Sequence, residues 1–168
     1  MRILEALLLL SSTLFTSLPA LALSPTITAN DIAREIRNRG VNSVVAELGE
    51  TGARQEIIHK ITTGDSNWVK LAFKLTQSMH IDFSKEIHYS LSIALINNPV
   101  DVLTTADKEK NISLADLCTI PPELETRENK IEFVDKVRKS LKSITDYEIK
   151  GRAEECFWEL DKAYNLEF

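Results

Sequence analysis

Apolar residues recur every three or four positions along most of the chain after residue 28, which is the spacing that places them on one face of an α-helix. The helix limits are clearest in the middle, where Gly64 ends one helix and Asp65 begins the next. Pro99 suits the first position of a later helix, where no amide hydrogen is needed. No window alternates apolar and polar residues as a strand does. The pattern therefore predicts an all-α protein, with helices over residues 28–39, 41–48, 52–62, 65–75, 82–96, 99–103, 126–144 and 146–164, and a short turn over 114–118. Ser84 is an alternative start for the helix that is placed at Asp82.

Glycine, proline and polar runs mark the connections between these helices. Gly49 and Gly64 are expected to end helices, and the charged residues 104–111 are predicted to form a loop. Pro121 and Pro122 cannot continue a helix, so the chain is expected to be extended there.

The C-terminal part of the chain holds the longest predicted helix, which lies within residues 126–144. A further helix, which begins after Thr145 or Asp146 and runs to about Tyr164, would pack back on it, so that the two form one long helical hairpin. Short connections favour antiparallel neighbours. We therefore expect antiparallel helical hairpins packed into a single domain over residues 23–168, after a separate segment over residues 1–22.

Residues 1–22 have the pattern of a secretory signal peptide. Arg2 gives a positive start, an apolar run extends over residues 4–15, and Ala20 and Ala22 form a small-x-small cleavage site. The run is shorter than the ~20 apolar residues that a transmembrane helix needs. An uncleaved anchor or a buried first helix is the alternative. We expect cleavage near Ala22 and a mature protein that is periplasmic or secreted.

The chain carries a formal charge of -5, and removal of residues 1–22 leaves this charge unchanged because that segment holds one arginine and one glutamate. A mildly acidic surface argues against binding of nucleic acid and against polybasic attachment to membranes. No second long apolar run follows, so we expect no stable membrane span in the mature chain. A protein partner with a basic surface would suit this charge.

Two cysteines, Cys118 and Cys156, remain after the signal peptide. An even number of cysteines in an exported chain favours a disulfide, because the compartment is oxidising. Two separate buried thiols are the alternative, and a bond could also join two chains. A bond within one chain would hold the segment after Cys118 against the last helix.

A metal-binding site is one possible function, because four potential ligands lie close together in the sequence, namely His80, Asp82, Glu86 and His88. Residues two apart on a helix point to different faces, and the spacing does not match known zinc sites. No nucleophile motif, phosphate-binding loop or cofactor motif is present either. We therefore assign no metal-binding and no cofactor-binding residue.

Paired carboxylates are the remaining candidates for chemistry, since acid–base catalysis of glycoside hydrolysis uses two such groups across a cleft. The densest pairs are Glu123 with Glu125 and Glu154 with Glu155. Both pairs lie in charged stretches, where solvation is the simpler interpretation. We assign no catalytic residue from the sequence.

Two residues are candidates for contact with a partner. Trp158 lies beside the apolar face of the last helix and is expected to be partly exposed, as tryptophans at binding surfaces are. Trp68, in contrast, is in helical phase with Leu71 and is expected in the core. Leu124 lies in the segment that a disulfide would hold in place. We predict Leu124 and Trp158 as partner contacts.

The helix start Gly-Asp-x-x-Trp, a later Asn-Pro-x-x-Val-Leu, a cysteine followed shortly by proline, and a second cysteine near the C-terminus form a recognisable pattern. This pattern resembles that of a family of uncharacterised small exported all-helical proteins of Gram-negative bacteria. Pro122 stands where that family has an aromatic residue. The resemblance implies an all-helical fold and export, and it implies no activity and no functional residues. The residues that carry it are Gly64, Asp65, Trp68, Asn98, Pro99, Val102, Leu103, Cys118, Pro121 and Cys156.

These features favour a non-enzymatic protein-binding module of the immunity or inhibitor type in the periplasm or outside the cell. One alternative is a small cell-envelope enzyme that uses Asp or Glu for acid–base chemistry, and another is a structural envelope component. An enzyme would show two convergent carboxylates with perturbed pKa values in a cleft. A binding module would show an exposed apolar surface instead.

Overall fold

The computed structural model describes residues 27–167, which form nine α-helices and no strand. This confirms the predicted all-α class for the described part of the chain. The predicted signal peptide lies outside the described residues. The helices are α1 (Ala29–Arg39), α2 (Val41–Glu50), α3 (Arg54–Thr62), α4 (Ser66–Leu75), α5 (Ile81–Ala94), α6 (Pro99–Glu109), α7 (Leu114–Leu117), α8 (Arg127–Lys142) and α9 (Tyr147–Glu167).

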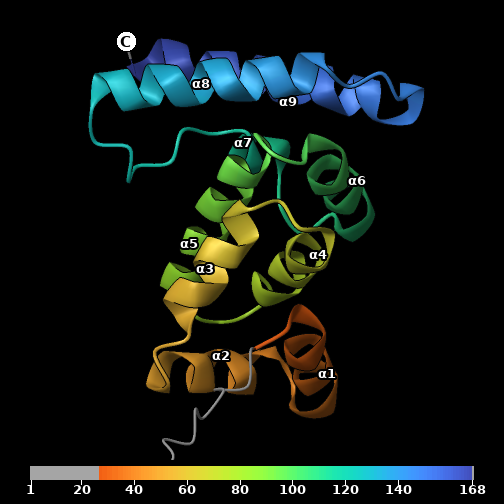
Figure 1. Ribbon diagram of the computed structural model, residues 1–168, viewed down its shortest axis with the longest axis vertical. Coiled ribbons are helices and arrows are strands. Elements are labelled where there is room, and N and C mark those ends of the chain that lie inside the picture. Colours follow the sequence, from red (N-terminus) through yellow and green to blue (C-terminus); the bar gives the residue numbers. More distant parts are fainter. Residues whose placement is uncertain (1–26, 168) are drawn as a thin grey trace, which may run out of the picture.

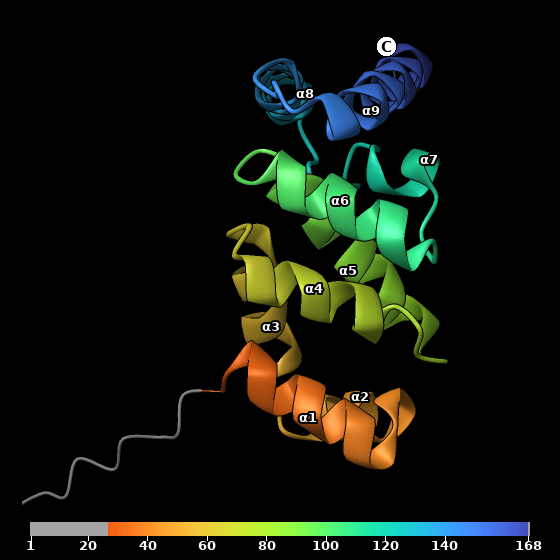
Figure 2. The ribbon, with the colours of Figure 1, turned by 90° about the vertical axis from the view of Figure 1, so that its right-hand side faces the viewer.

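The helices are stacked in layers along the longest axis of the molecule (Figure 1). α1 and α2 form one end, α8 and α9 lie side by side across the other end, and α3 to α7 fill the middle (Figures 1 and 2). α1 packs on α4, while α9 packs on α6 and α7, so both end layers are joined to the middle by helix contacts. The pair α8 and α9 is the predicted long C-terminal hairpin.

A connected set of buried apolar side chains holds these layers together. Val45 of α2, Ile61 of α3, Phe73 of α4, Leu91 of α5 and Leu160 of α9 are all fully buried. Removing each such side chain from water is worth about 1.5–3 kcal/mol. The surfaces described below are therefore carried by a packed helical scaffold.

Several helices begin where the sequence predicts. Thr28, Asp65, Ser113 and Thr126 each precede a helix, and their side chains accept a hydrogen bond from an amide in its first turn. Asp146 does the same for the second residue of α9. These side chains satisfy amide groups that have no partner within the helix.

The prediction that Gly49 ends the second helix is wrong. α2 continues to Glu50, and the turn is made by Gly52, whose φ of 72° favours glycine. A Cβ on Gly49 would lie 2.7 Å from the Nη2 atom of Arg54. That nitrogen donates to the Val45 carbonyl at 3.2 Å. Gly49 therefore makes room for a guanidinium that joins α3 to α2.

The prediction that residues 104–111 form a loop is also wrong. α6 continues to Glu109 because its Thr105 and Ala106 side chains are buried. The charged residues of this stretch hid the helical spacing of its buried positions. The helix ends at Lys110, which has a φ of 53°.

The longest helix is α9 with 21 residues, and not the 16-residue α8 within residues 126–144. α9 continues past Tyr164 to Glu167. Gly151 lies inside it, where an added Cβ would meet no atom within 4 Å. Among the residues that the structure describes, neither α9 nor any other helix combines the length and apolar character needed to cross a membrane.

The two central motifs of the family resemblance meet in space at the starts of α4 and α6. The Asn98 side chain donates to the Gly64 carbonyl at 2.8 Å, and the Ser66 hydroxyl donates to the Asp101 carboxylate. Gly64 has a φ of 76°, and a Cβ there would lie 3.0 Å from the Cβ of Asn98. These motif residues therefore have a structural role, because they lock two helix starts together.

Serine side chains join other helix ends across the layers. The Ser92 hydroxyl of α5 donates to the Leu117 carbonyl at the end of α7, at 2.6 Å. The Ser140 hydroxyl of α8 donates to the Leu95 carbonyl just after α5, at 2.8 Å. The last carbonyls of a helix lack partners within it, so these bonds satisfy them from a neighbouring element.

Candidate functional site

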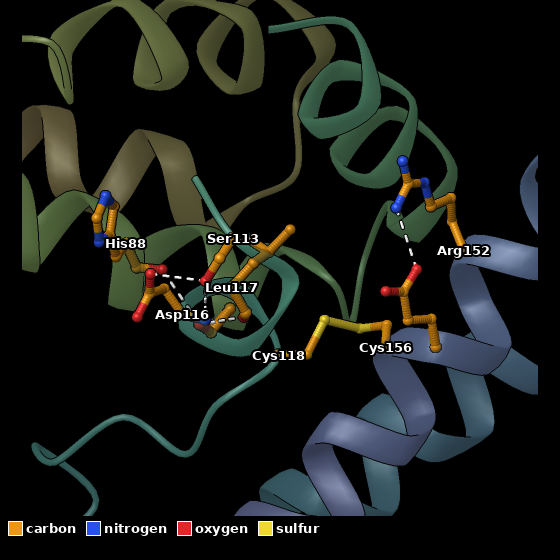
Figure 3. Close-up of a disulfide and its surroundings, with 9 residues drawn as sticks. His88, Ser113, Asp116, Leu117, Cys118, Arg152 and Cys156 are labelled. Atoms are coloured by element: carbon orange, nitrogen blue, oxygen red, sulfur yellow. Dashed lines mark hydrogen bonds and ion pairs between the residues drawn. A yellow bond between two sulfur atoms is a disulfide. The ribbon is translucent and has the colours of Figure 1, made fainter. Parts of the chain in front are cut away.

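Cys118, which follows α7, and Cys156, in the middle of α9, form a disulfide with 5.4 Å between their Cα atoms (Figure 3). Both residues are at most 1% exposed. This confirms the predicted pairing and places it within one chain. The Arg152 side chain also donates from Nε to the Asp107 carboxylate at 2.9 Å, which joins α9 to α6. α9 is thus anchored to the middle layer by a covalent bond and an ion pair.

Leu124 lies in the connection between α7 and α8. It is half-buried and packs against the core. A shallow groove of about 210 Å³ beside it is lined in part by Ile93, Ile96 and Phe133. Part of the Leu124 side chain is therefore used in packing, and only the remainder is exposed to solvent.

Trp158 of α9 is 61% exposed, and the Lys162 ammonium lies 5.1 Å from the centre of its ring. Two residues correspond to about 200° of rotation in an α-helix, so Trp158 points away from the side of buried Cys156. Trp68, in comparison, is half-buried against the core. Leu124 lines the groove next to Phe133, whereas Trp158 is exposed on α9.

A groove of about 420 Å³ opens between α1, α2 and the start of α3. Its apolar floor includes Ile32, Val44 and Leu48. Four carboxylates and one guanidinium also line it. We call this surface the acidic groove; its charged residues are Asp31, Glu35, Glu47, Glu56 and Arg39.

Arg39 is shared between two of these carboxylates. Its Nε lies 3.2 Å from a Glu35 oxygen, and its Nη2 donates to Glu47. The hydrogen bond to Glu47 raises the pKa of Arg39 above its usual value. One guanidinium therefore faces two carboxylates, which leaves an excess of negative charge at this rim.

The other two carboxylates of the acidic groove differ in their pairing. Asp31 accepts from the Thr28 hydroxyl, and this bond, followed by that from Arg34, lowers the Asp31 pKa. Glu56 is exposed and has no ion pair among the described residues. The groove thus offers an apolar floor next to carboxylates that remain accessible to a cation from outside.

The candidate metal ligands from the sequence do not converge in the structure; these residues are His80, Asp82, Glu86 and His88. Within residues 27–167, no three His, Cys, Asp or Glu side chains are grouped so that they could hold a metal ion. His80 precedes α5 and Asp82 lies in its first turn, whereas His88 lies two turns further along.

His88, Ser113 and Asp116 lie near the disulfide (Figure 3). The Ser113 hydroxyl donates to Asp116 at 2.7 Å and also caps α7. A catalytic triad needs the imidazole between the hydroxyl and the carboxylate, and here the hydroxyl bonds the carboxylate directly. Burial lowers the pKa of His88, against a smaller opposite effect of Asp116. The contact between Ser113 and Asp116 is therefore explained by capping of α7.

Two further carboxyl groups have shifted pKa values, and both shifts are downward. The hydrogen bond from Ser66 lowers the pKa of Asp101, and that from Lys136 lowers the pKa of Glu132. A general acid that works near neutral pH needs a raised pKa. Asp101 and Glu132 therefore fit structural roles.

The carboxylate pairs noted in the sequence lie apart on the surface. Glu123 and Glu125 are exposed in the connection before α8. Glu155 pairs with Arg152 at 3.1 Å, while Glu154 lines a groove between α8 and α9. The structure brings neither pair together across a shared groove.

A scan against protein-family models finds no match, and searches of the curated proteins and of the solved structures find none either. The resemblance to exported all-helical proteins of Gram-negative bacteria therefore stays a prediction. The function of the chain has to be inferred from its own surfaces.

The sequence interpretation missed the acidic groove. Asp31 and Glu35 lie four residues apart beside Ile32, so α1 already carries a signal of an acidic edge next to an apolar position. Glu47 joins them only because α2 packs against α1. That last step needs the tertiary structure.

Proposed function

We propose that this chain is an exported, non-enzymatic protein-binding module of the immunity or inhibitor type, and that its acidic groove binds the partner. The observation that carries the proposal is the apolar floor of Ile32, Val44 and Leu48 beside four carboxylates and a single guanidinium. Such a surface suits a partner segment with apolar side chains flanked by lysine or arginine, because opposite charges steer and orient association.

Two further features support the proposal. The disulfide and the core fix the scaffold before binding, which lowers the ordering cost of association. The disulfide also suits an oxidising compartment, in keeping with the signal-peptide pattern of residues 1–22. The parallel with immunity and inhibitor proteins is an analogy at the level of the fold.

A defined peptide tests the groove directly. The probe is a labelled helical peptide with leucines along one face and lysines on both sides of them, and its match has glutamate in place of lysine. Fluorescence anisotropy with the mature protein should show binding of the lysine peptide, weakened by salt because exposed charges are screened within ~10 Å at 0.1 M. The glutamate peptide should bind at least about tenfold more weakly.

A pair of charge-matched variants locates the binding. Glu47→Gln with Glu56→Gln should weaken the lysine peptide about threefold to tenfold, as expected for two exposed ionic contacts. Glu123→Gln with Glu125→Gln makes the same change of net charge away from the groove and should leave affinity unchanged. Equal affinity for both peptides, or equal effects of both variants, would overturn the proposal. Periplasmic proteins retained by the wild type and by the control variant, but lost with the groove variant, would then identify the natural partner.

A further inference from the structure

A second groove, independent of the acidic groove, opens where the end of α8 meets the start of α9. Its volume is about 350 Å³. Leu141, Ile144, Ala153 and Phe157 form an apolar floor. Ligand pockets of proteins typically span ~300–1,000 Å³, so this groove has room for a small ligand. We call it the α8–α9 groove.

The charges of the α8–α9 groove differ in sign from those of the acidic groove. Lys142 and Lys150 line it together with Glu154. Both lysines are exposed, and neither has an ion pair with a carboxylate among the described residues. The Lys142 ammonium lies 5.1 Å from the centre of the Phe157 ring, so this cation is positioned above the apolar floor.

We propose that the α8–α9 groove binds a small aliphatic carboxylate, such as a free medium-chain fatty acid. The alkyl chain lies on the floor of Leu141, Ile144 and Phe157, and the carboxylate meets Lys142 and Lys150. Each methylene group removed from water strengthens binding roughly fourfold, which makes the alkyl chain the main source of affinity.

The balance of charge at the groove favours an anion over an uncharged ligand. Two ammonium groups and the Glu154 carboxylate leave one net positive charge at the rim. A single carboxylate neutralises this charge, and its attraction to the two ammonium groups outweighs its repulsion by Glu154.

Decanoate and decanol are suitable probes because they share the chain and differ in charge. Titration of the nitrogen-15-labelled mature protein should shift the amide signals of residues 141–157 with decanoate. Decanol should shift the same signals with an affinity about threefold to tenfold weaker, which is the range for one or two exposed ionic contacts.

Variants separate the groove from general adsorption. Lys142→Gln with Lys150→Gln should reduce the affinity for decanoate to that for decanol and leave decanol unaffected. Lys85→Gln with Lys139→Gln makes the same change of net charge on exposed positions outside the groove and should leave both affinities unchanged. Equal binding of decanoate and decanol to the wild type, shifts spread over the whole surface, or an absence of shifts would overturn the proposal.

Discussion

Replacing both Cys118 and Cys156 by alanine should lower the free energy of unfolding by about 2–4 kcal/mol. The two residues are separated by 38 positions, and the entropy of closing a loop of that size in the unfolded chain corresponds to about 4 kcal/mol at 25 °C. Alanine is chosen because both sulfur atoms are buried, and a serine hydroxyl there would add the cost of an unpaired polar group.

Urea unfolding followed by far-ultraviolet circular dichroism measures this loss. Wild-type protein that is reduced while unfolded and refolded with reductant provides the control, and its stability should match that of the double alanine variant. A loss well below 1 kcal/mol, or two free thiols in the unreduced wild type unfolded in urea, would refute the reasoning.

Hydrogen exchange then shows where the stabilisation acts. Without the disulfide, residues 118–126 have few remaining ties, among which the Leu124 amide donates to the Pro121 carbonyl. Their exchange should accelerate first, whereas the helices between Asp65 and Leu103 should stay protected because their core side chains are unchanged. Equal acceleration in both regions would show that the disulfide stabilises the whole fold and not this segment.

Four further predictions concern stability and processing. Gly64→Ala should destabilise the protein by about 1–3 kcal/mol in urea unfolding, because it forces a non-glycine residue to a φ of 76° next to Asn98. Gly151→Ala should stabilise it by about 0.5–1 kcal/mol, because Gly151 lies inside α9 and an added Cβ has open space. The pKa of Asp101 is lowered in the folded state, so its contribution to stability is present above the unfolded pKa near 4 and is lost as pH falls through the folded pKa. Asp101→Asn should therefore flatten this acidic part of the plot of unfolding free energy against pH, and an unchanged plot would contradict the assignment. N-terminal sequencing of the protein isolated from its host should begin near Leu23, and a protein that keeps residue 1 would refute the predicted signal peptide.

Local chemistry allowed the helix starts to be predicted. A side chain such as Asp65 or Thr126 caps a helix through amides only two or three residues away, so the sequence alone contains the whole interaction. The disulfide was also predictable, because with two cysteines only one pairing within the chain exists. Neither inference depends on knowing how the layers pack.

The predictions about Gly49 and about residues 104–111 were wrong for the opposite reason. The role of Gly49 depends on Arg54, which folds over it from the next helix. The helix through residues 104–111 depends on burial of Thr105 and Ala106 against other elements. In both cases a tertiary contact overrides a local signal, as happens for residues with modest intrinsic propensity.

The candidate grooves were the least predictable features. Lys142 and Lys150 come from two helices, and they share a groove only because the α8–α9 turn brings the helices together. The same is true of Glu35 and Glu47 across α1 and α2. The charges within one helix could indicate an acidic or basic edge of that helix, but not which edge of another helix it would meet.

The disulfide between Cys118 and Cys156 also changes what a single proteolytic cut can do. It turns the chain from 118 to 156 into a covalent ring that includes all of α8 and the first half of α9. Glu123 and Glu125 are exposed in a connection without regular structure, where proteases cut most readily. A cut between them opens the ring but releases no fragment, so the nicked molecule keeps its mass on a gel until reductant separates its two pieces. In a compartment that contains proteases, the end layer stays attached after the first cut.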